Sequence, residues 1–97
     1  MELSNKDIKK LKKLAHDLKP VVFLGQKGIT DSLIKATEEA LNDHELIKVR
    51  FVDFKEAKKD IIAEIIEKTA SHLISIIGNI AIIYKPQENP EKKVIVL

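Results

Sequence analysis

Two isoleucine-rich runs near the C-terminus constrain the fold more than any other feature of the sequence. "HLISII" (72–77) and "IAIIYK" (80–85) are separated only by Gly78 and Asn79. A two-residue connection that tolerates positive φ is typical of a tight hairpin between antiparallel strands. Both runs are apolar on both faces, so each face of their sheet needs at least partial cover. The N-terminal helix is expected to provide one of these covers.

Three segments repeat apolar residues at helical spacing. The first begins at a Ser4 cap and ends before Pro20, and the second follows a Thr30 cap and stops at the polar stretch 42–45. The third covers residues 55–70. Caps, spacing and stop signals together predict three helices.

Two further strands are predicted between these helices. Residues 21–24 form a short apolar run, which indicates a buried strand. Residues 46–52 alternate, with Lys48 and Arg50 on the face opposite to the apolar side chains. The final "VIVL" (94–97) is expected either to add a short edge strand or to pack loosely.

The order α-β-α-β-α-β-β predicts an α/β fold with a mixed sheet of about four strands. With 97 residues, of which 44% are hydrophobic and 33% charged, the chain is expected to form a single compact domain over residues 1–97. Absence of cysteine excludes disulfides and thiolate chemistry. The start lacks the apolar core of a signal peptide and no apolar run is long enough to span a bilayer, so a cytoplasmic protein without a membrane partner is expected.

Residue patterns typical of enzymes are missing from the sequence. His16, His44 and His72 are isolated from one another, and no serine lies in a nucleophile elbow. The loop "GQKG" is too short for a phosphate cradle or a dinucleotide turn. We therefore expect no catalytic activity, no cofactor and no metal; a small phosphorylated ligand at residues 25–30 is the one opening for an enzyme.

The loop Gly25-Gln26-Lys27-Gly28 joins the predicted strand 21–24 to the helix after it and contains two of the three glycines. Glycines allow a backbone to approach a ligand closely, and Lys27 adds a positive charge suited to phosphate. Asp31 opposes this, because an acid in the first helical turn already compensates the helix dipole. A GxxG pattern alone is most often an ordinary turn. The KH module also uses a GxxG clamp, but between two helices, so a KH domain is not predicted.

Positive charge gathers at the N-terminal end, although the net charge is only +2. Residues 1–28 carry seven lysines against three acids, whereas residues 31–45 carry five acids and one lysine. The N-terminal lysines are Lys6, Lys9, Lys10, Lys12, Lys13, Lys19 and Lys27. Each one alone is explained by a solvated helix face, but their density around the glycine loop favours an anionic partner.

Three segments in order, "LAHDLKPVVFLGQKGIT" (14–30), "ELIKV" (45–49) and "IIGNIAIIYKP" (76–86), resemble the CRM domain, named for chloroplast RNA splicing and ribosome maturation, in its stand-alone bacterial YhbY form. The resemblance implies RNA binding, a fold like the C-terminal domain of translation initiation factor three, and association with precursors of the large ribosomal subunit. It places the family's loop at residues 25–28. Family members often carry a cation after the hairpin glycine, where this chain has Asn79.

The leading prediction is a monomeric, non-catalytic RNA-binding protein that assists large-subunit assembly, with no preference for DNA. The residues expected to contact RNA are Gly25, Gln26, Lys27 and Gly28 of the loop, the surrounding Lys9, Lys10, Lys12, Lys13 and Lys19, and in a second tier Lys48, Arg50 and Lys85. With few aromatics, base stacking is expected to be minor and Tyr84 to be a core residue. The alternative is a protein-interaction module whose acidic segment 31–45 docks a ribosomal protein.

Overall fold

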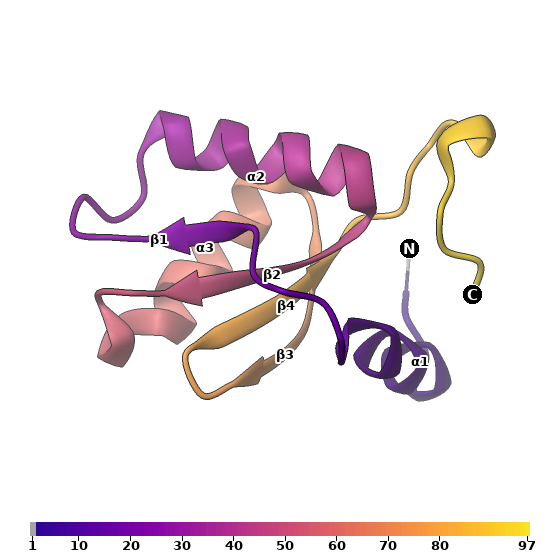
Figure 1. Ribbon diagram of the computed structural model, residues 1–97, viewed down its shortest axis with the longest axis horizontal. Coiled ribbons are helices and arrows are strands. Elements are labelled where there is room, and N and C mark those ends of the chain that lie inside the picture. Colours follow the sequence, from indigo (N-terminus) through magenta and orange to yellow (C-terminus); the bar gives the residue numbers. More distant parts are fainter. Residues whose placement is uncertain (1) are drawn as a thin grey trace.

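The computed structural model describes residues 2–97 as a four-stranded sheet with helices on both faces (Figure 1). The elements are α1 (Asn5–Ala15), β1 (Val22–Leu24), α2 (Asp31–His44), β2 (Leu46–Phe51), η1 (Lys55–Ala57), α3 (Lys58–Thr69), β3 (His72–Ile77), β4 (Ile80–Tyr84) and η2 (Pro90–Lys92), where η denotes a single 3-10 turn. This order confirms the predicted α/β class with three helices and a mixed sheet.

The sheet has the strand order β1-β2-β4-β3. β1 runs parallel to β2, while β4 runs antiparallel to both of its neighbours, β2 and β3. Gly78 adopts φ +60° between β3 and β4, which confirms the tight hairpin. Because β4 lies between β2 and β3, the most apolar strands occupy the middle and one edge of the sheet.

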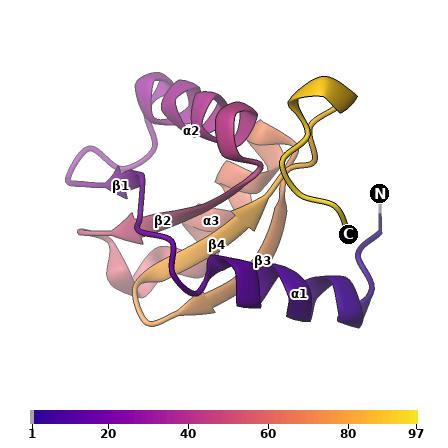
Figure 2. The ribbon, with the colours of Figure 1, turned by 45° about the vertical axis from the view of Figure 1, so that its right-hand side comes forward.

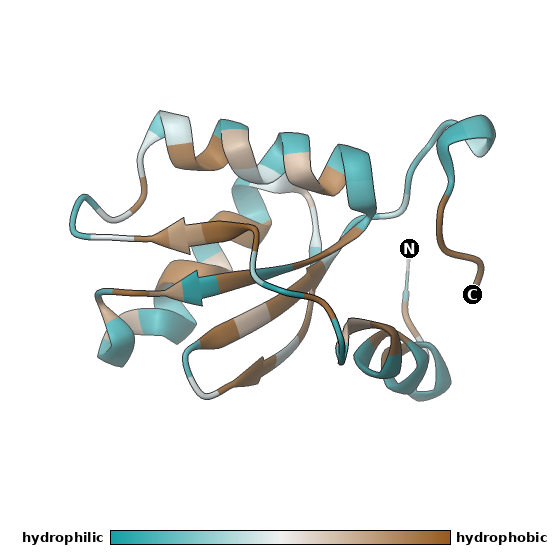
Figure 3. Ribbon diagram, viewed as in Figure 1, coloured by the Kyte–Doolittle hydropathy of each residue, from teal (hydrophilic) through white to brown (hydrophobic). Residues whose placement is uncertain are grey.

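Two separate clusters of apolar side chains cover the two faces. On one face, α2 and α3 pack against the sheet through residues such as Leu41, Ile62 and Val49. On the other face, Leu11 of α1 packs against Tyr84 and neighbouring strand residues. Figure 2 shows α1 in front of the sheet and α3 behind it, and Figure 3 shows hydrophobic residues along the strands between the helices. The expected cover of both faces is confirmed.

The first helix is shorter than its sequence pattern suggested. It ends at Ala15, and the residues between it and Pro20 form a turn in which Leu18 N–H donates to Ala15 O at 3.0 Å. Proline disfavours helical backbone in the residue before it. In addition, Lys48 Nζ donates to the carbonyl oxygens of Leu18, at 2.8 Å, and His16, at 3.4 Å. The end of α1 is thereby fixed to β2.

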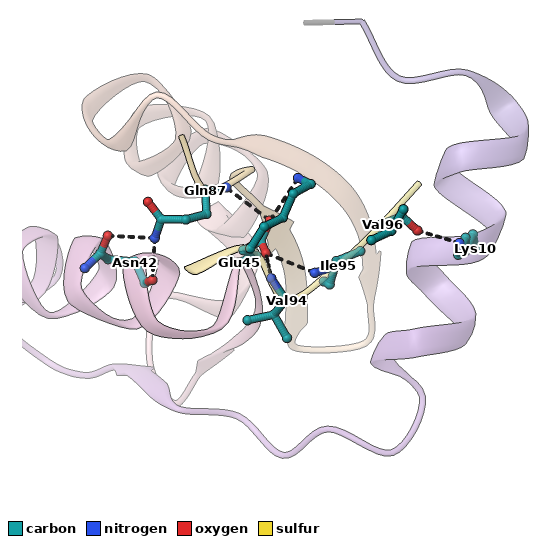
Figure 4. Close-up of polar contacts among 8 residues, drawn as sticks. Lys10, Asn42, Glu45, Gln87, Val94, Ile95 and Val96 are labelled. Carbon is teal, nitrogen blue, oxygen red and sulfur yellow. Dashed lines mark hydrogen bonds and ion pairs between the residues drawn. The ribbon is translucent and has the colours of Figure 1, made fainter. Parts of the chain in front are cut away.

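Glu45, at the junction of α2 and β2, binds the C-terminal segment (Figure 4). Its side chain is fully buried, and its backbone adopts φ +63°. The carboxylate accepts N–H donors from Gln87 at 3.1 Å, from Ile95 at 3.0 Å and from Val94. Lys93 Nζ lies 3.5 Å from the same carboxylate. One buried acid therefore holds residues 87–95 against the fold.

Of the two expectations for "VIVL", the edge strand is wrong, because the segment forms no strand. Val94, Val96 and Leu97 are exposed, in agreement with the expected loose packing, but the segment is anchored. Ile95 is buried in the cluster that contains Leu11 of α1, and Lys10 Nζ donates to Val96 O at 2.5 Å. The C-terminal residues thus act as a strap between the start of β2 and α1, because side-chain acceptors and donors replace the missing strand partners.

The environment of Glu45 lowers its pKa. Burial by itself raises the pKa of the carboxyl group, but hydrogen bonds from the amides of Val94, Gln87 and Ile95, with the charge of Lys93, outweigh this effect. The pKa therefore lies below the ordinary value of 4.5. A lowered folded-state pKa stabilises the fold above the unfolded-state pKa, and this stabilisation is lost as the pH falls through the folded-state value.

We predict that Glu45→Gln lowers the stability at pH 7 by about 2 kcal/mol, since several hydrogen bonds lose their charged acceptor. For a domain of this size that is roughly a 10 °C decrease in Tm. The difference from wild type should shrink as the pH falls from 4.5 through the lowered folded-state pKa, where the wild-type carboxylate also becomes protonated. Thermal melts across pH measure both effects.

Glu39→Gln is the matched control for this experiment, because Glu39 is an exposed acid of α2. It should melt like wild type at neutral pH. If Glu45→Gln also melted like wild type at pH 7, the carboxylate would not hold the C-terminal segment in solution.

Candidate nucleic-acid interface

The glycine loop lies between β1 and α2, at one end of the molecule (Figure 1). Gly28 N–H donates to Gly25 O at 3.0 Å and closes the turn, which leaves Gln26 and Lys27 exposed at its tip. Gly28 adopts φ +65°, a conformation that side chains with a Cβ rarely take, whereas Gly25 does not. The second glycine is therefore needed for the shape of the loop.

Phe54 supports this loop from the next connection. A Cβ added at Gly28 would lie 3.6 Å from the Phe54 ring, so the ring packs next to the glycine backbone. The N–H groups of Val52 and Asp53 donate to Leu24 O at 2.9 and 3.1 Å. These contacts join the connection after β2 to the end of β1 and hold the glycine loop in a defined position.

A hollow of 510 Å³ lies over the loop and the start of α2. Thr30 caps this helix, with its Oγ1 accepting Leu33 N–H at 3.0 Å. Phe23 and Lys27 are among the side chains that line the hollow. Its combination of glycine backbone, an exposed cation and an aromatic ring suits a nucleotide phosphate with a base beside it.

The lysines of α1 lie away from the loop. Figure 1 shows the glycine loop at the left end and α1 toward the right. Lys9, Lys12 and Lys13 are exposed on α1, while Lys10 is bonded to the C-terminal strap. Lys19 lines an apolar groove of 590 Å³ together with side chains from α1 and the strap. The predicted cations thus form a loop group and a helix group, so an RNA that contacts both must extend along the molecule.

The second-tier cations differ in their availability. Lys48 is half-buried and already donates to two carbonyl oxygens at the end of α1. Arg50, two residues further along β2, is exposed and lines a hollow of 290 Å³ with Phe23, Lys55 and other residues. Lys85 is half-buried and lies beside the polar chain segment after β4. Arg50 shares its hollow with Phe23, which also lines the hollow over the glycine loop.

Sequence reasoning missed Phe23 because it treated residues 21–24 as buried throughout. Val22 and Leu24 are buried, but Phe23 between them has a relative exposure of 55%. The run 21–24 is apolar at every position, so its sequence does not show which side chains face the core. Tyr84, in contrast, is fully buried, which confirms it as a core residue. Burial raises the pKa of Tyr84, with the negative charges of Glu45 and Asp7 adding to the effect.

Residues 2–97 contain no group of three side chains suited to hold a metal ion. Within the same range, no helix has the length and apolar character needed to cross a membrane.

The acidic segment 31–45, the alternative docking surface, offers fewer exposed acids than its sequence suggests, since Glu45 is buried in the fold. Asp31, Glu38, Glu39 and Asp43 of α2 remain exposed.

Comparisons with known proteins agree with this geometry. Residues 3–85 match the model of the CRS1/YhbY (CRM) domain family. A Haemophilus influenzae protein named "RNA-binding protein" is 44% identical over 87 residues, which cover 89% of this chain and 88% of that protein. The Bacillus subtilis "Probable RNA-binding protein YqeI" is 36% identical over 96 residues, or 98% of each chain.

A solved structure is also similar. The solution structure of a Staphylococcus aureus protein, for which RNA binding has been suggested, superposes with a TM-score of 0.76 at 33% identity. The similarity covers 97% of this chain and 100% of that one. With its glycine loop, its sheet and the matched family model, the chain belongs to the CRS1/YhbY (CRM) domain family.

Proposed function

We propose that this protein is a non-catalytic RNA-binding protein that binds ribosomal RNA in precursors of the large subunit and assists their assembly. The observation that carries the proposal is the exposed Lys27 at the tip of a glycine loop, in a chain of the CRM family. Relatives named as RNA-binding proteins support the RNA partner. The proposal includes that the protein acts as a monomer in the cytoplasm.

The loop supplies two features that a phosphate needs. Gly28 holds the turn in a conformation that brings backbone to the surface, and Lys27 extends a full positive charge beside it. Arg50 is the register partner of Phe23 and adds a second cation with a planar donor group. Contacts of this kind recognise the sugar-phosphate backbone, so they position RNA without reading its sequence.

We predict that Lys27→Glu weakens RNA binding and flattens its salt dependence. Each phosphate contact that is lost removes about 0.7 to 0.9 from the slope of log K against log salt concentration. Titrations of a structured ribosomal RNA fragment at several salt concentrations measure this slope. Lys68→Glu, at an exposed position on α3, is the control of equal charge change and should leave the slope closer to wild type. Equal slopes for Lys27→Glu and wild type would remove Lys27 from the interface.

The two loop glycines should respond differently to alanine. Gly28→Ala forces a Cβ into φ +65° and should distort the loop, reducing RNA binding and costing about 1 kcal/mol of stability. Gly25→Ala is the matched control, since a Cβ there meets no atom within 4 Å and φ is not positive. Binding titrations and thermal melts of both variants test this. Equal effects of the two substitutions would show that the conformation of Gly28 does not determine binding.

Sedimentation of a cell extract tests the ribosomal part of the proposal. At low salt the protein should travel with large-subunit precursors, and raising the salt should release it, because phosphate contacts weaken as counterions compete. Ribonuclease treatment should also release it. If the protein stayed at the top of the gradient at low salt, stable association with these precursors would be excluded. Ribonuclease-resistant comigration would instead favour docking to a ribosomal protein through the acidic face of α2.

A further inference from the structure

Phe23 is an aromatic side chain left open to solvent in the middle of a strand. Its neighbours Val22 and Leu24 point into the core, whereas Phe23 lies on the opposite face with a relative exposure of 55%. An exposed apolar ring loses the hydrophobic stabilisation that burial would give it. The ring is therefore available for a ligand with an apolar surface of its own.

The position of α1 explains why Phe23 is uncovered. α1 buries the end of this face that contains Leu46 and Tyr84, which are partners in the register of β2 and β4. At the other end of the same strands, Arg50 pairs with Ile80, and Arg50 is exposed. Phe23 is the register partner of Arg50 on β1. The open end of the sheet thus presents a ring and a guanidinium side by side.

Phe23 also connects two hollows. It lines the 510 Å³ hollow over the glycine loop and the 290 Å³ hollow that contains Arg50, Lys55 and Asn79. Each of these two hollows contains a cation, Lys27 in the first and Arg50 in the second. A flat apolar group flanked by negative charges complements this arrangement, and a nucleotide within an RNA strand has that chemistry: a base between two phosphates.

A base inside a duplex cannot use such a ring, because its two faces are covered by neighbouring base pairs. A base in a bulge, in a loop or at a strand end is free to stack on an aromatic side chain. The chemistry of the site therefore selects unpaired nucleotides over paired ones. Stacking on a ring tolerates every base, since each has a π-face, so this selection does not depend on base identity.

We propose that Phe23 is the stacking platform for one unpaired base of the bound RNA, with Arg50 and Lys55 on the phosphate to one side and the glycine loop on the phosphate to the other. The proposal rests on the RNA binding proposed above and adds the structural feature of the RNA that the protein recognises. A single platform is consistent with recognition that is mainly by backbone and shape.

The test uses two RNAs that differ in one nucleotide: a fully paired duplex and the same duplex with a single bulged 2-aminopurine. The fluorescence of this base decreases when it stacks. Wild type, Phe23→Leu, Phe23→Tyr and Lys27→Glu are compared in binding titrations against both RNAs, after thermal melts have confirmed that each is folded. Leucine keeps an apolar side chain without a ring, while tyrosine keeps the ring.

We expect Phe23→Leu to weaken binding of the bulged RNA about tenfold, within the range of stacking contributions measured by substitution. Its affinity for the paired duplex should be unchanged, and the fluorescence decrease at the bulge should be lost. The salt slope should stay the same, because no phosphate contact is removed. Phe23→Tyr should bind both RNAs like wild type.

Other outcomes overturn the proposal in distinguishable ways. If Phe23→Leu bound both RNAs like wild type while Lys27→Glu still flattened the salt slope, RNA binding would stand and the stacking role would fall. Equal weakening on both RNAs, or a tyrosine variant as weak as leucine, would also exclude stacking. If wild type bound neither RNA, both proposals would fail.

Discussion

The fold depends on the buried carboxylate of Glu45. Its φ of +63° turns the chain from α2 directly into β2, and its side chain accepts amides from a segment about half the chain away in sequence. A buried charge is unfavourable unless it is hydrogen-bonded. Here several donors surround the Glu45 carboxylate. By holding residues 87–95, Glu45 brings Ile95 into the cluster under α1. The placement of α1 is therefore linked to Glu45, which lies at the junction of α2 and β2.

The placement of α1 in turn determines which part of the sheet is free. α1 is fixed at its C-terminal end by Lys48 and is bonded to the strap through Lys10. Two cations that sequence alternation assigns to the same face consequently have different roles: Lys48 stabilises the fold, while Arg50 remains open to a ligand.

Much of the fold could be predicted from local patterns, and the exceptions share a physical cause. Helical spacing, the Ser4 and Thr30 caps and the Gly78-Asn79 turn each depend on residues close in sequence, and the structure has the corresponding elements. The role of Glu45 was missed because its partners lie far along the chain, and locally it reads only as a polar helix end. The strap at residues 94–97 was missed for the same reason.

In the candidate site, too, the features that depend on neighbouring residues could be predicted, whereas those that depend on distant packing could not. The glycine loop was found because its residues are contiguous, and its conformation at Gly28 agrees with the reason for singling it out. Phe23 was missed because a strand of three residues is too short to establish which side chains face the core. Its exposure follows from what α1 leaves uncovered, which no local pattern contains.

The separation of the two cation groups places a further constraint on the RNA. The molecule is 36 Å long, with the glycine loop toward one end and α1 toward the other. The open end of the sheet, with Phe23 and Arg50, adjoins the loop, while α1 occupies the other end of the same face. An RNA that contacts both groups runs along this face and passes the ring. An RNA duplex interrupted by one unpaired base satisfies this geometry. Its paired part presents phosphates to the lysines of α1, and the unpaired position presents a base to Phe23.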